Sequence, residues 1–170
     1  MKFTNCRTFA SYAFRNSTIS EIIMPPVKVS GTFNYIFYNT QVVEPDFSLI
    51  DLSEATDFSG VFRDCSKLLR IKGVLDIKAS AFFSEWNNAT NLITMYVKNL
   101  GGRASSGRFL YSISPLTKLS AESLTYLIEN LFDRKTAGYA SVNITFGTTL
   151  LNKLSAEQKS SITAKGFTYT

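Results

Sequence analysis

Histidine is absent from the 170 residues of this chain, and cysteine occurs only twice. Without histidine, the Ser-His-Asp and Cys-His mechanisms, the usual zinc ligand sets and the most common general base are excluded. Two cysteines are also too few for a disulfide framework. We therefore expect no catalytic residue, no metal site and no bound cofactor.

Charge is sparse as well, with 18% charged residues and a formal net charge of +5. The densest basic pair is Arg134-Lys135, and such a pair is usually a solvated helix end. Because a polyanion-binding surface needs a basic patch, we expect no nucleic-acid binding. Apolar runs are far shorter than the roughly 20 residues of a membrane-spanning helix, so no membrane insertion is expected. Residues 1–7 lack the apolar stretch of a signal peptide. This leaves open a cytosolic protein, a virion protein released by lysis, or an excised fragment.

An internal repeat organises residues 1–100. Aromatic anchors recur at spacings of 23, 25 and 24 residues, and an Asn or Asp follows each anchor two residues later. An aliphatic residue comes next in every copy. The anchors are Phe14, Phe37, Phe62 and Trp86, the turn residues are Asn16, Asn39, Asp64 and Asn88, and the aliphatic residues are Ile19, Val42, Leu68 and Leu92.

A unit of about 24 residues cannot bury its own apolar face, so neighbouring copies must supply the other wall of the core. We expect the aromatic and aliphatic residues to form one continuous core. The Asn and Asp residues should form a ladder of turns, since they tolerate left-handed backbone geometry and bond locally. The aliphatic residues should lie on short strands that align in parallel. One carboxylate, Asp64, among three amides is a poor cation site.

The repeat also bears on the two cysteines. If Cys6 and Cys65 occupy equivalent positions two or three coils apart, they are about 10–14 Å apart at about 4.8 Å per coil. A disulfide requires Cα atoms within about 7 Å. Both cysteines are therefore expected to be reduced, buried thiols.

Residues 20–26 (Ser-Glu-Ile-Ile-Met-Pro-Pro), followed by residues 35–39 (Tyr-Ile-Phe-Tyr-Asn), resemble the BspA-type leucine-rich repeat. That family has an aliphatic strand ending in proline, a spacer, and a Phe-x-Asn/Asp-Cys turn, which residues 62–65 match best. The spacers, residues 27–34 and 50–59, are uneven. The resemblance implies an α/β fold, a leucine-rich-repeat-like solenoid of short parallel strands with a helical C-terminal cap.

Beyond the repeats, residues 101–115 form a Gly/Ser-rich loop and connection. It lacks the lysine of a phosphate-binding loop and is expected to be a flexible surface loop. Residues 116–170 are expected to form a C-terminal α/β cap packed on the solenoid. Their pattern is similar to the terminal segment that follows such repeats in proteins of gut bacteria and their phages.

The cap has clear start and stop signals for its elements. Ser120 is a predicted N-cap, before a helix with one apolar face. Residues 142–146 alternate like a strand and stop at a glycine. Ser155 and Gln158 have capping-box spacing for a second helix, which should end at Gly166 before a last strand over residues 167–170. The apolar face of the first helix comprises Leu124, Leu127, Ile128 and Leu131.

The resemblance implies a non-enzymatic structural or adhesive binding module, carried on a phage virion in the tail or a fibre. The expected partners are other virion or surface proteins, with a glycan receptor as a further class, and a homo-oligomer is left open. Tyr38, Tyr96 and Tyr111 are candidate surface contacts. The alternative is a fragment of a bacterial cell-surface leucine-rich-repeat adhesin.

A third alternative is a glycan hydrolase that uses paired carboxylates for acid and base catalysis. The carboxylates available are Asp46, Asp51, Glu54 and Asp57. They fall in a spacer and show no spacing typical of a catalytic pair, so a solvated face is the favoured interpretation.

Overall fold

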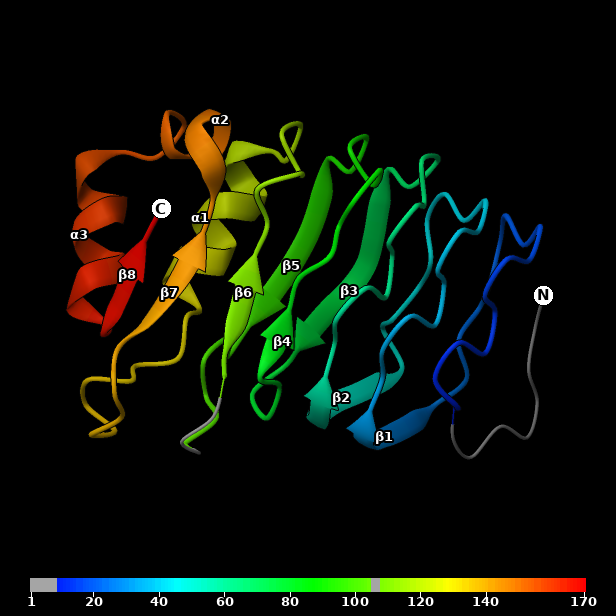
Figure 1. Ribbon diagram of the computed structural model, residues 1–170, viewed down its shortest axis with the longest axis horizontal. Coiled ribbons are helices and arrows are strands. Elements are labelled where there is room, and N and C mark those ends of the chain that lie inside the picture. Colours follow the sequence, from blue (N-terminus) through cyan, green and yellow to red (C-terminus); the bar gives the residue numbers. More distant parts are fainter. Residues whose placement is uncertain (1–8, 105–107) are drawn as a thin grey trace.

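The computed structural model describes residues 9–104 and 108–170 of the chain. Successive segments lie side by side from the N-terminal end to the C-terminal end, where the helices gather (Figure 1). Every strand pair in the described residues is parallel. The strands are β1 (Val27–Thr32), β2 (Ile50–Asp57), β3 (Arg70–Asp76), β4 (Phe82–Phe83), β5 (Thr94–Lys98), β6 (Leu110–Ser112), β7 (Val142–Thr145) and β8 (Phe167–Tyr169), and the helices are α1 (Ala121–Glu129), α2 (Gly147–Leu151) and α3 (Ala156–Ala164).

The strands form three small sheets. β1 pairs with β2, β3 pairs with β5, and the third sheet has the order β4-β6-β7-β8. Single parallel bridges join Ile23 to Asp46 and Asp46 to Lys72. The expected α/β class with short parallel strands and few helices is confirmed.

The strand positions in the first two copies differ from the prediction. β1 and β2 occupy the spacers, while the aliphatic segments before them contribute only the bridges at Ile23 and Asp46. Proline explains the shift, because Pro25, Pro26 and Pro45 offer no N–H to a ladder there. The third and fourth copies have no proline at these positions, and their aliphatic segments run into β3 and β5.

The turns of successive copies are joined by backbone hydrogen bonds. The N–H of Phe14 donates to the carbonyl of Ile36 at 2.9 Å, and the N–H of Phe37 donates to the carbonyl of Val61 at 3.0 Å. The next copy continues the pattern, with Gly60 donating to Ser84 at 2.9 Å. Each turn therefore uses the following turn to satisfy its backbone donors.

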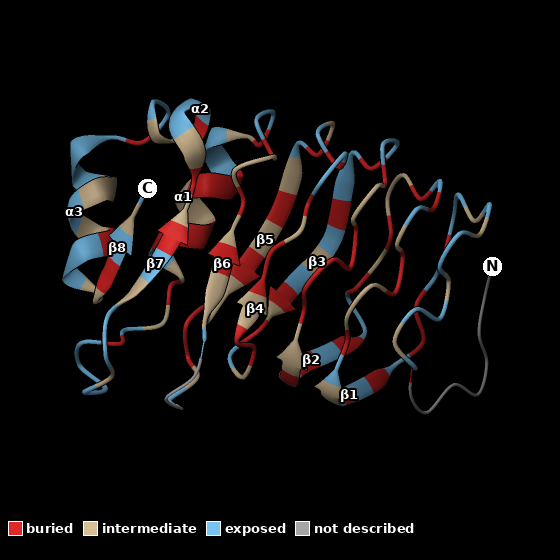
Figure 2. Cartoon of the chain, in the orientation of Figure 1, coloured by how far each residue is buried: buried red, intermediate tan, exposed pale blue. Residues whose placement is uncertain are grey.

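The aromatic anchors form a continuous stack. Ring centroids are 5.3 Å apart for Phe14 and Phe37, 5.5 Å for Phe37 and Phe62, and 5.8 Å for Phe62 and Trp86. Phe37, Phe62 and Trp86 are buried, while Phe14, at the N-terminal end, is half-buried. Buried residues recur in successive segments of the chain from β1 to the C-terminal helices (Figure 2). The aliphatic residues Val42, Leu68 and Leu92 lie in the same core, with Ile19 partly buried against it.

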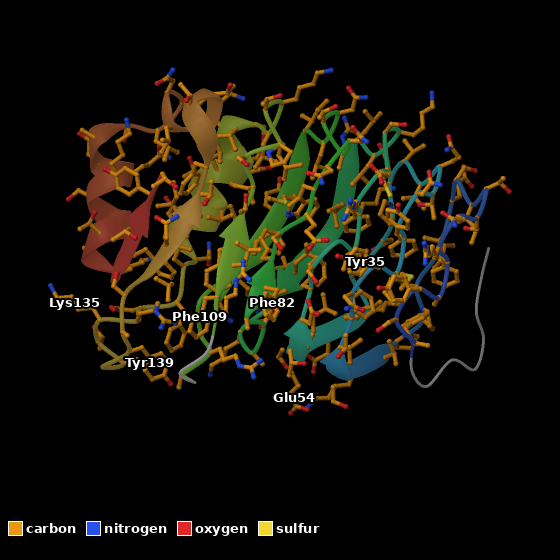
Figure 3. All side chains as sticks on the ribbon, in the orientation of Figure 1. Tyr35, Glu54, Phe82, Phe109, Lys135 and Tyr139 are labelled. Atoms are coloured by element: carbon orange, nitrogen blue, oxygen red, sulfur yellow. The ribbon has the colours of Figure 1, made fainter. Side chains whose placement is uncertain are left out.

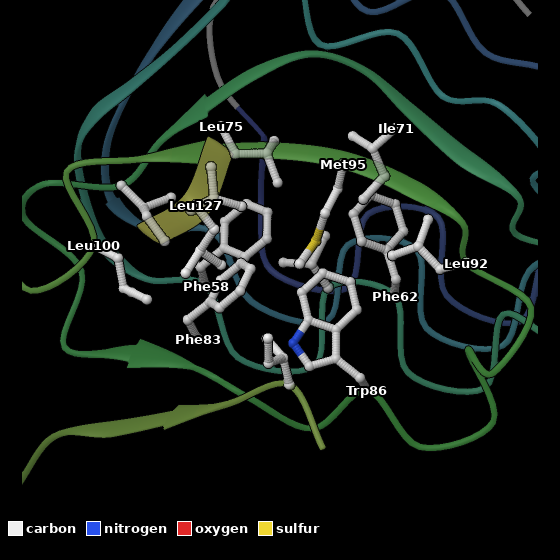
Figure 4. Close-up of a cluster of buried hydrophobic side chains, with 14 of the residues drawn as sticks. Phe58, Phe62, Ile71, Leu75, Phe83, Trp86, Leu92, Met95, Leu100 and Leu127 are labelled. Atoms are coloured by element: carbon white, nitrogen blue, oxygen red, sulfur yellow. The ribbon is translucent and has the colours of Figure 1, made fainter. Parts of the chain in front are cut away.

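A second aromatic column lies beside the first. Phe33 stacks on Phe58 with centroids 5.9 Å apart, and Phe58 stacks on Phe83 at 5.7 Å. Phe83 meets Trp86 edge to face at 5.0 Å, which joins the two columns (Figure 4). Such offset and edge contacts add to the stabilisation from burial alone.

The Asn and Asp residues occupy the same backbone position in every turn. Asn16, Asn39, Asp64 and Asn88 have φ angles of 58°, 55°, 61° and 59°. Asn39 donates to the Oδ1 atom of Asn16 at 3.0 Å, and Asn88 donates to the Oδ1 atom of Asp64 at 2.6 Å. Asx side chains tolerate this left-handed conformation better than other residues do.

Cys65 is a free, buried thiol whose Sγ atom donates to the carbonyl of Phe37 at 2.9 Å. Burial raises its pKa. Cys6 lies outside the described residues. Cys65 therefore behaves as a core residue that ties one copy to the previous one.

Residues 116–170 are joined to the repeats by hydrogen bonds next to β5. The N–H of Ser120 donates to the carbonyl of Ile93 at 2.8 Å, and the N–H of Met95 donates to the Oγ atom of Ser123 at 3.1 Å. Ser120 caps α1 and Ser155 caps α3, the latter with a complete capping box. Helix α1 thus covers the edge of β5, while β7 and β8 extend the sheet of β4 and β6.

Two details of the cap differ from the prediction. α1 ends at Glu129, where the side chain of Asn130 donates to the carbonyl of Tyr126 at 2.8 Å, so the buried Leu131 lies beyond the helix. The short helix α2 was not predicted. Its N-cap residue is Phe146, whose side chain makes no capping hydrogen bond, so the sequence lacks the usual polar residue at the start of the helix. No helix among the described residues is both long and apolar enough to cross a membrane.

The expectation of a solvated Arg134 is wrong. Its side chain is 1% exposed, and its guanidinium donates to the carbonyls of Gly101, Arg103 and Ala140. Burial lowers its pKa. Gly101 is itself buried. The segment over residues 101–115, predicted to be a flexible surface loop, therefore begins with packed residues. The guanidinium also lies 5.2 Å from the ring centroid of Phe109 and 5.5 Å from that of Tyr139 (Figure 3).

Candidate binding surface

A second left-handed position recurs in each turn, near the aromatic anchor. Tyr12, Tyr35, Gly60 and Glu85 have φ angles of 65°, 52°, 60° and 64°. Glycine adopts this conformation freely, whereas a tyrosine held there costs on the order of 1 kcal/mol or more. Strain of this kind gathers at functional sites. The two tyrosines therefore mark this edge of the molecule as a candidate site.

The side chains of Tyr12 and Tyr35 each contact the following copy. The rings of Tyr12 and Tyr35 are parallel to within 7°, with centroids 5.1 Å apart. The Tyr35 ring lies against Gly60, where an added Cβ would stand 2.3 Å from it. The Tyr35 hydroxyl then reaches the fourth copy and donates to the carboxylate of Glu85. Gly60 thus provides the space that the Tyr35 ring occupies.

Two arginines contact the tyrosine rings and the Glu85 carboxylate at this edge. The guanidinium of Arg15 lies 5.4 Å from the ring centroid of Tyr12 and 5.1 Å from that of Tyr38. Arg63 lies 5.8 Å from the Tyr38 ring and 3.4 Å from the Glu85 carboxylate. Contacts between a cation and an aromatic face are favourable even at exposed sites. We call this set of six residues the tyrosine-arginine cluster: Tyr12, Arg15, Tyr35, Tyr38, Arg63 and Glu85.

The pKa of Tyr35 rises to about 12, first because of burial and then because its hydroxyl donates to Glu85. A phenol with the ordinary pKa of 10.0 is already protonated at neutral pH, so the higher pKa extends the bond to Glu85 into the alkaline range. The hydroxyl of Tyr35 thus links the second copy to the fourth.

A shallow, open polar groove of about 480 Å³ adjoins the cluster along the turn ladder. Tyr38 offers an aromatic ring, while amides, hydroxyls and the Asp64 carboxylate supply both donors and acceptors. We call this the asparagine groove, lined by Tyr38, Asn39, Asp64, Ser66, Asn88 and Thr90. A ring face beside such mixed polar groups suits a ligand that has both C–H faces and hydroxyls.

The structure separates the three tyrosines that were candidate surface contacts. Tyr38 lies in the cluster and in the groove. Tyr96 is half-buried and donates to Glu122 of α1 at 2.6 Å, so it links the repeats to the cap. The expectation for Tyr111 is wrong: it is 1% exposed and donates to the carbonyl of Ser80 at 3.1 Å. Its side chain points from β6 into the core.

Sequence reasoning missed most of the cluster. Tyr12 and Tyr35 both stand two residues before an aromatic anchor, and this shared offset was the available signal. The third and fourth copies conceal it, because Gly60 and Glu85 share only the backbone conformation with the tyrosines.

The carboxylates considered for catalysis are engaged elsewhere. Hydrogen bonds from Ser48 and Ser53 lower the pKa values of Asp46 and Asp51. Asp57 accepts from Ser59, and Glu54 pairs with Lys28 at 2.8 Å. Acid catalysis needs a carboxyl group whose pKa is raised, and Asp46 and Asp51 have the opposite shift. In the part of the chain that the structure describes, no three acidic or cysteine side chains gather as a metal site.

Comparisons of the chain with protein-family models, with curated proteins and with solved structures each found no match.

Proposed function

We propose that the chain is a non-enzymatic binding module that holds a saccharide along its turn edge. The turn edge is the side of the molecule formed by the turns that carry the tyrosine-arginine cluster and the asparagine groove. In this proposal the repeats form a leucine-rich-repeat-like solenoid, closed by the cap of residues 116–170. The stacked aromatic anchors and the turn-to-turn hydrogen bonds support a solenoid, because both recur at the repeat spacing. The stack would then be a rigid support for the tyrosine-arginine cluster.

The observation that carries the proposal is the left-handed backbone of Tyr12 and Tyr35. Strain at these positions is maintained although glycine would relieve it, as Gly60 does in the third copy. Tyrosine and arginine are, with tryptophan, enriched among the residues that dominate binding energy at protein interfaces. Because the rings and guanidinium groups are already fixed, a ligand would lose little affinity to ordering them.

A saccharide fits this edge better than a protein partner does. The asparagine groove is small and polar, and Tyr38 is the ring at its side. Amide and hydroxyl groups can pair with sugar hydroxyls, while the edge of the Tyr38 ring can pack against the C–H groups of a pyranose. An extended apolar surface, which a large protein interface would bring, is not part of this groove.

The setting of the module is also a proposal. The resemblance of the repeats and cap favours a virion component in a phage tail or fibre, in contact with other virion proteins. A fragment of a bacterial cell-surface adhesin is the alternative. Detection of the chain in purified virions by mass spectrometry supports the first, and its recovery only from bacterial envelopes supports the second.

The binding proposal is tested with a glycan microarray and isothermal titration of the full chain. Tyr38→Ala should weaken the affinity for the tightest-binding saccharide by roughly tenfold or more, as expected for an aromatic hot spot. Tyr126→Ala is the matched control, because Tyr126 is half-buried like Tyr38 but lies on α1 of the cap. Failure to bind any saccharide on the array and in solution would contradict the proposal.

A further inference from the structure

Arg15 differs from the other arginine of the cluster in its charge environment. Arg63 lies 3.4 Å from Glu85 and 3.8 Å from Asp64, so two carboxylates offset its charge. Arg15 has no ion pair within residues 9–104 and 108–170. Its side chain is exposed, and the contacts found for its guanidinium are with the rings of Tyr12 and Tyr38.

The turn edge is therefore electrically polarised. Arg15 places an unbalanced positive charge at one end of the cluster, next to Tyr38. Asp64 and Glu85 place negative charge toward the other end, where Asn88 donates to Asp64 at 2.6 Å. A ligand that lies across Tyr38 meets an anion-binding group on one side and hydrogen-bond acceptors on the other.

The rings give the Arg15 guanidinium an advantage in binding a carboxylate. A guanidinium presents two parallel N–H donors that match the two oxygens of a carboxylate. Contacts with the rings of Tyr12 and Tyr38 restrict the position of the guanidinium, which reduces the entropy lost when the anion binds. Within residues 9–104 and 108–170, no ion pair engages the N–H groups of this guanidinium, which leaves them for a ligand.

Resting on the proposed function, we propose that the saccharide is acidic and that Arg15 binds its carboxylate. A uronic or sialic acid residue places its carboxylate on Arg15 and the C–H groups of its ring against the edge of the Tyr38 ring. Its hydroxyls, or those of the next sugar, reach Asn39 and Asp64 in the asparagine groove. The orientation follows from the polarity of the edge, since hydroxyls can donate to Asp64 whereas a second carboxylate there is repelled.

The test uses an array on which each carboxylated saccharide is paired with its neutral methyl ester, together with sulfated saccharides of the same backbone. The best pair is then titrated calorimetrically with the full chain. The carboxylated member should bind roughly tenfold or more tightly than its ester, as expected for a charged hydrogen-bonded pair. This preference should shrink as salt rises, since exposed charges are screened.

Arg15→Gln should remove the preference, so that acid and ester bind alike, and Arg15→Lys should keep only part of it. Arg70→Gln is the matched control, because Arg70 is an exposed arginine that pairs with Glu44 at 3.2 Å, away from the cluster. Circular dichroism and thermal unfolding show that each variant is folded. If Arg15→Gln does not fold, two other measurements test the role of Arg15. Arg15→Lys should keep only part of the preference for acid over ester, and the preference of the unsubstituted chain should shrink as salt rises.

Each outcome separates the inference from the proposed function. Equal binding of acid and ester by the unsubstituted chain overturns the inference and leaves saccharide binding intact. A preference for acid that persists in Arg15→Gln overturns the role of Arg15, and tighter binding of the sulfated form overturns the choice of a carboxylate. Absence of binding to any saccharide overturns both proposals.

Discussion

The hydroxyl of Tyr35 donates a hydrogen bond to the carboxylate of Glu85, fifty residues further along the chain. The two residues occupy the same turn position in the second and fourth copies, and Gly60 occupies it in the third. A side chain at Gly60 would collide with the Tyr35 ring. The contact thus spans a whole copy and depends on the glycine beneath it.

Gly60→Ala should therefore destabilise the chain and displace Tyr35. The left-handed φ of 60° costs about 1–2 kcal/mol for a residue with a Cβ, and the ring contact at 2.3 Å adds to it. Gly138→Ala is the control, because Gly138 has a φ of 71° but nothing within 4 Å of the added Cβ. Urea unfolding of both variants measures the difference. Equal losses would show that the Tyr35 ring does not lie against Gly60.

Alkaline titration should reveal two late-ionising tyrosines. Burial is the main cause that raises the pKa values of Tyr35 and Tyr111 to about 12, above the ordinary value of 10.0. Above pH 10 the unfolded chain loses these protons first, so the stability that they contribute is present below pH 10 and is lost as pH rises toward about 12. Tyrosinate absorbance measures the ionisation. Tyr35→Phe should remove one of the two late steps. Ionisation of every tyrosine near the ordinary pKa of 10.0 would contradict the burial of Tyr35 and Tyr111.

Cys65 should resist thiol reagents in the folded chain. Its side chain is 0% exposed and its pKa is raised by burial, so little reactive thiolate reaches solvent. The measurement is the rate of reaction in a Cys6→Ser variant, which leaves Cys65 as the remaining thiol. Rapid reaction without denaturant would mean that the core around Cys65 opens readily; reaction only after denaturation is expected.

Truncation of an anchor should cost more in the middle of the stack than at its end. Phe37→Ala removes a fully buried ring between two neighbours and should cost about 3–5 kcal/mol. Phe14→Ala should cost clearly less, because Phe14 is half-buried and stacks on Phe37 alone among the anchors in the described residues. Chemical denaturation of the two variants gives the comparison. A larger loss for Phe14 would contradict the arrangement of the column.

The sequence was informative where a feature is local and repeated. The anchors and their Asn or Asp residues keep a constant offset, and each plays the same part in every turn. Helix starts at Ser120 and Ser155 were also predictable, since capping depends on the few residues nearby. These features need no knowledge of the rest of the chain.

The remaining features depend on contacts between distant residues. The carbonyls that accept hydrogen bonds from Arg134 come from segments both before and after it in the sequence. The Arg134-Lys135 pair alone therefore could not reveal that Arg134 is buried. Tyr111 lies on a strand of three residues, which is too short to show which side chain faces the core. The tyrosine-arginine cluster brings together residues from four copies, and its left-handed positions share no residue type beyond the two tyrosines.

The most direct test of the account is to map the saccharide on the chain by NMR. Amide shifts of an isotope-labelled sample are followed during titration with the tightest-binding saccharide from the array. The account predicts that the largest changes fall in the turns around Arg15, Tyr38, Asn39 and Asp64, with little change in α1 and α3. Changes concentrated in the cap, or spread evenly over the chain, would contradict it.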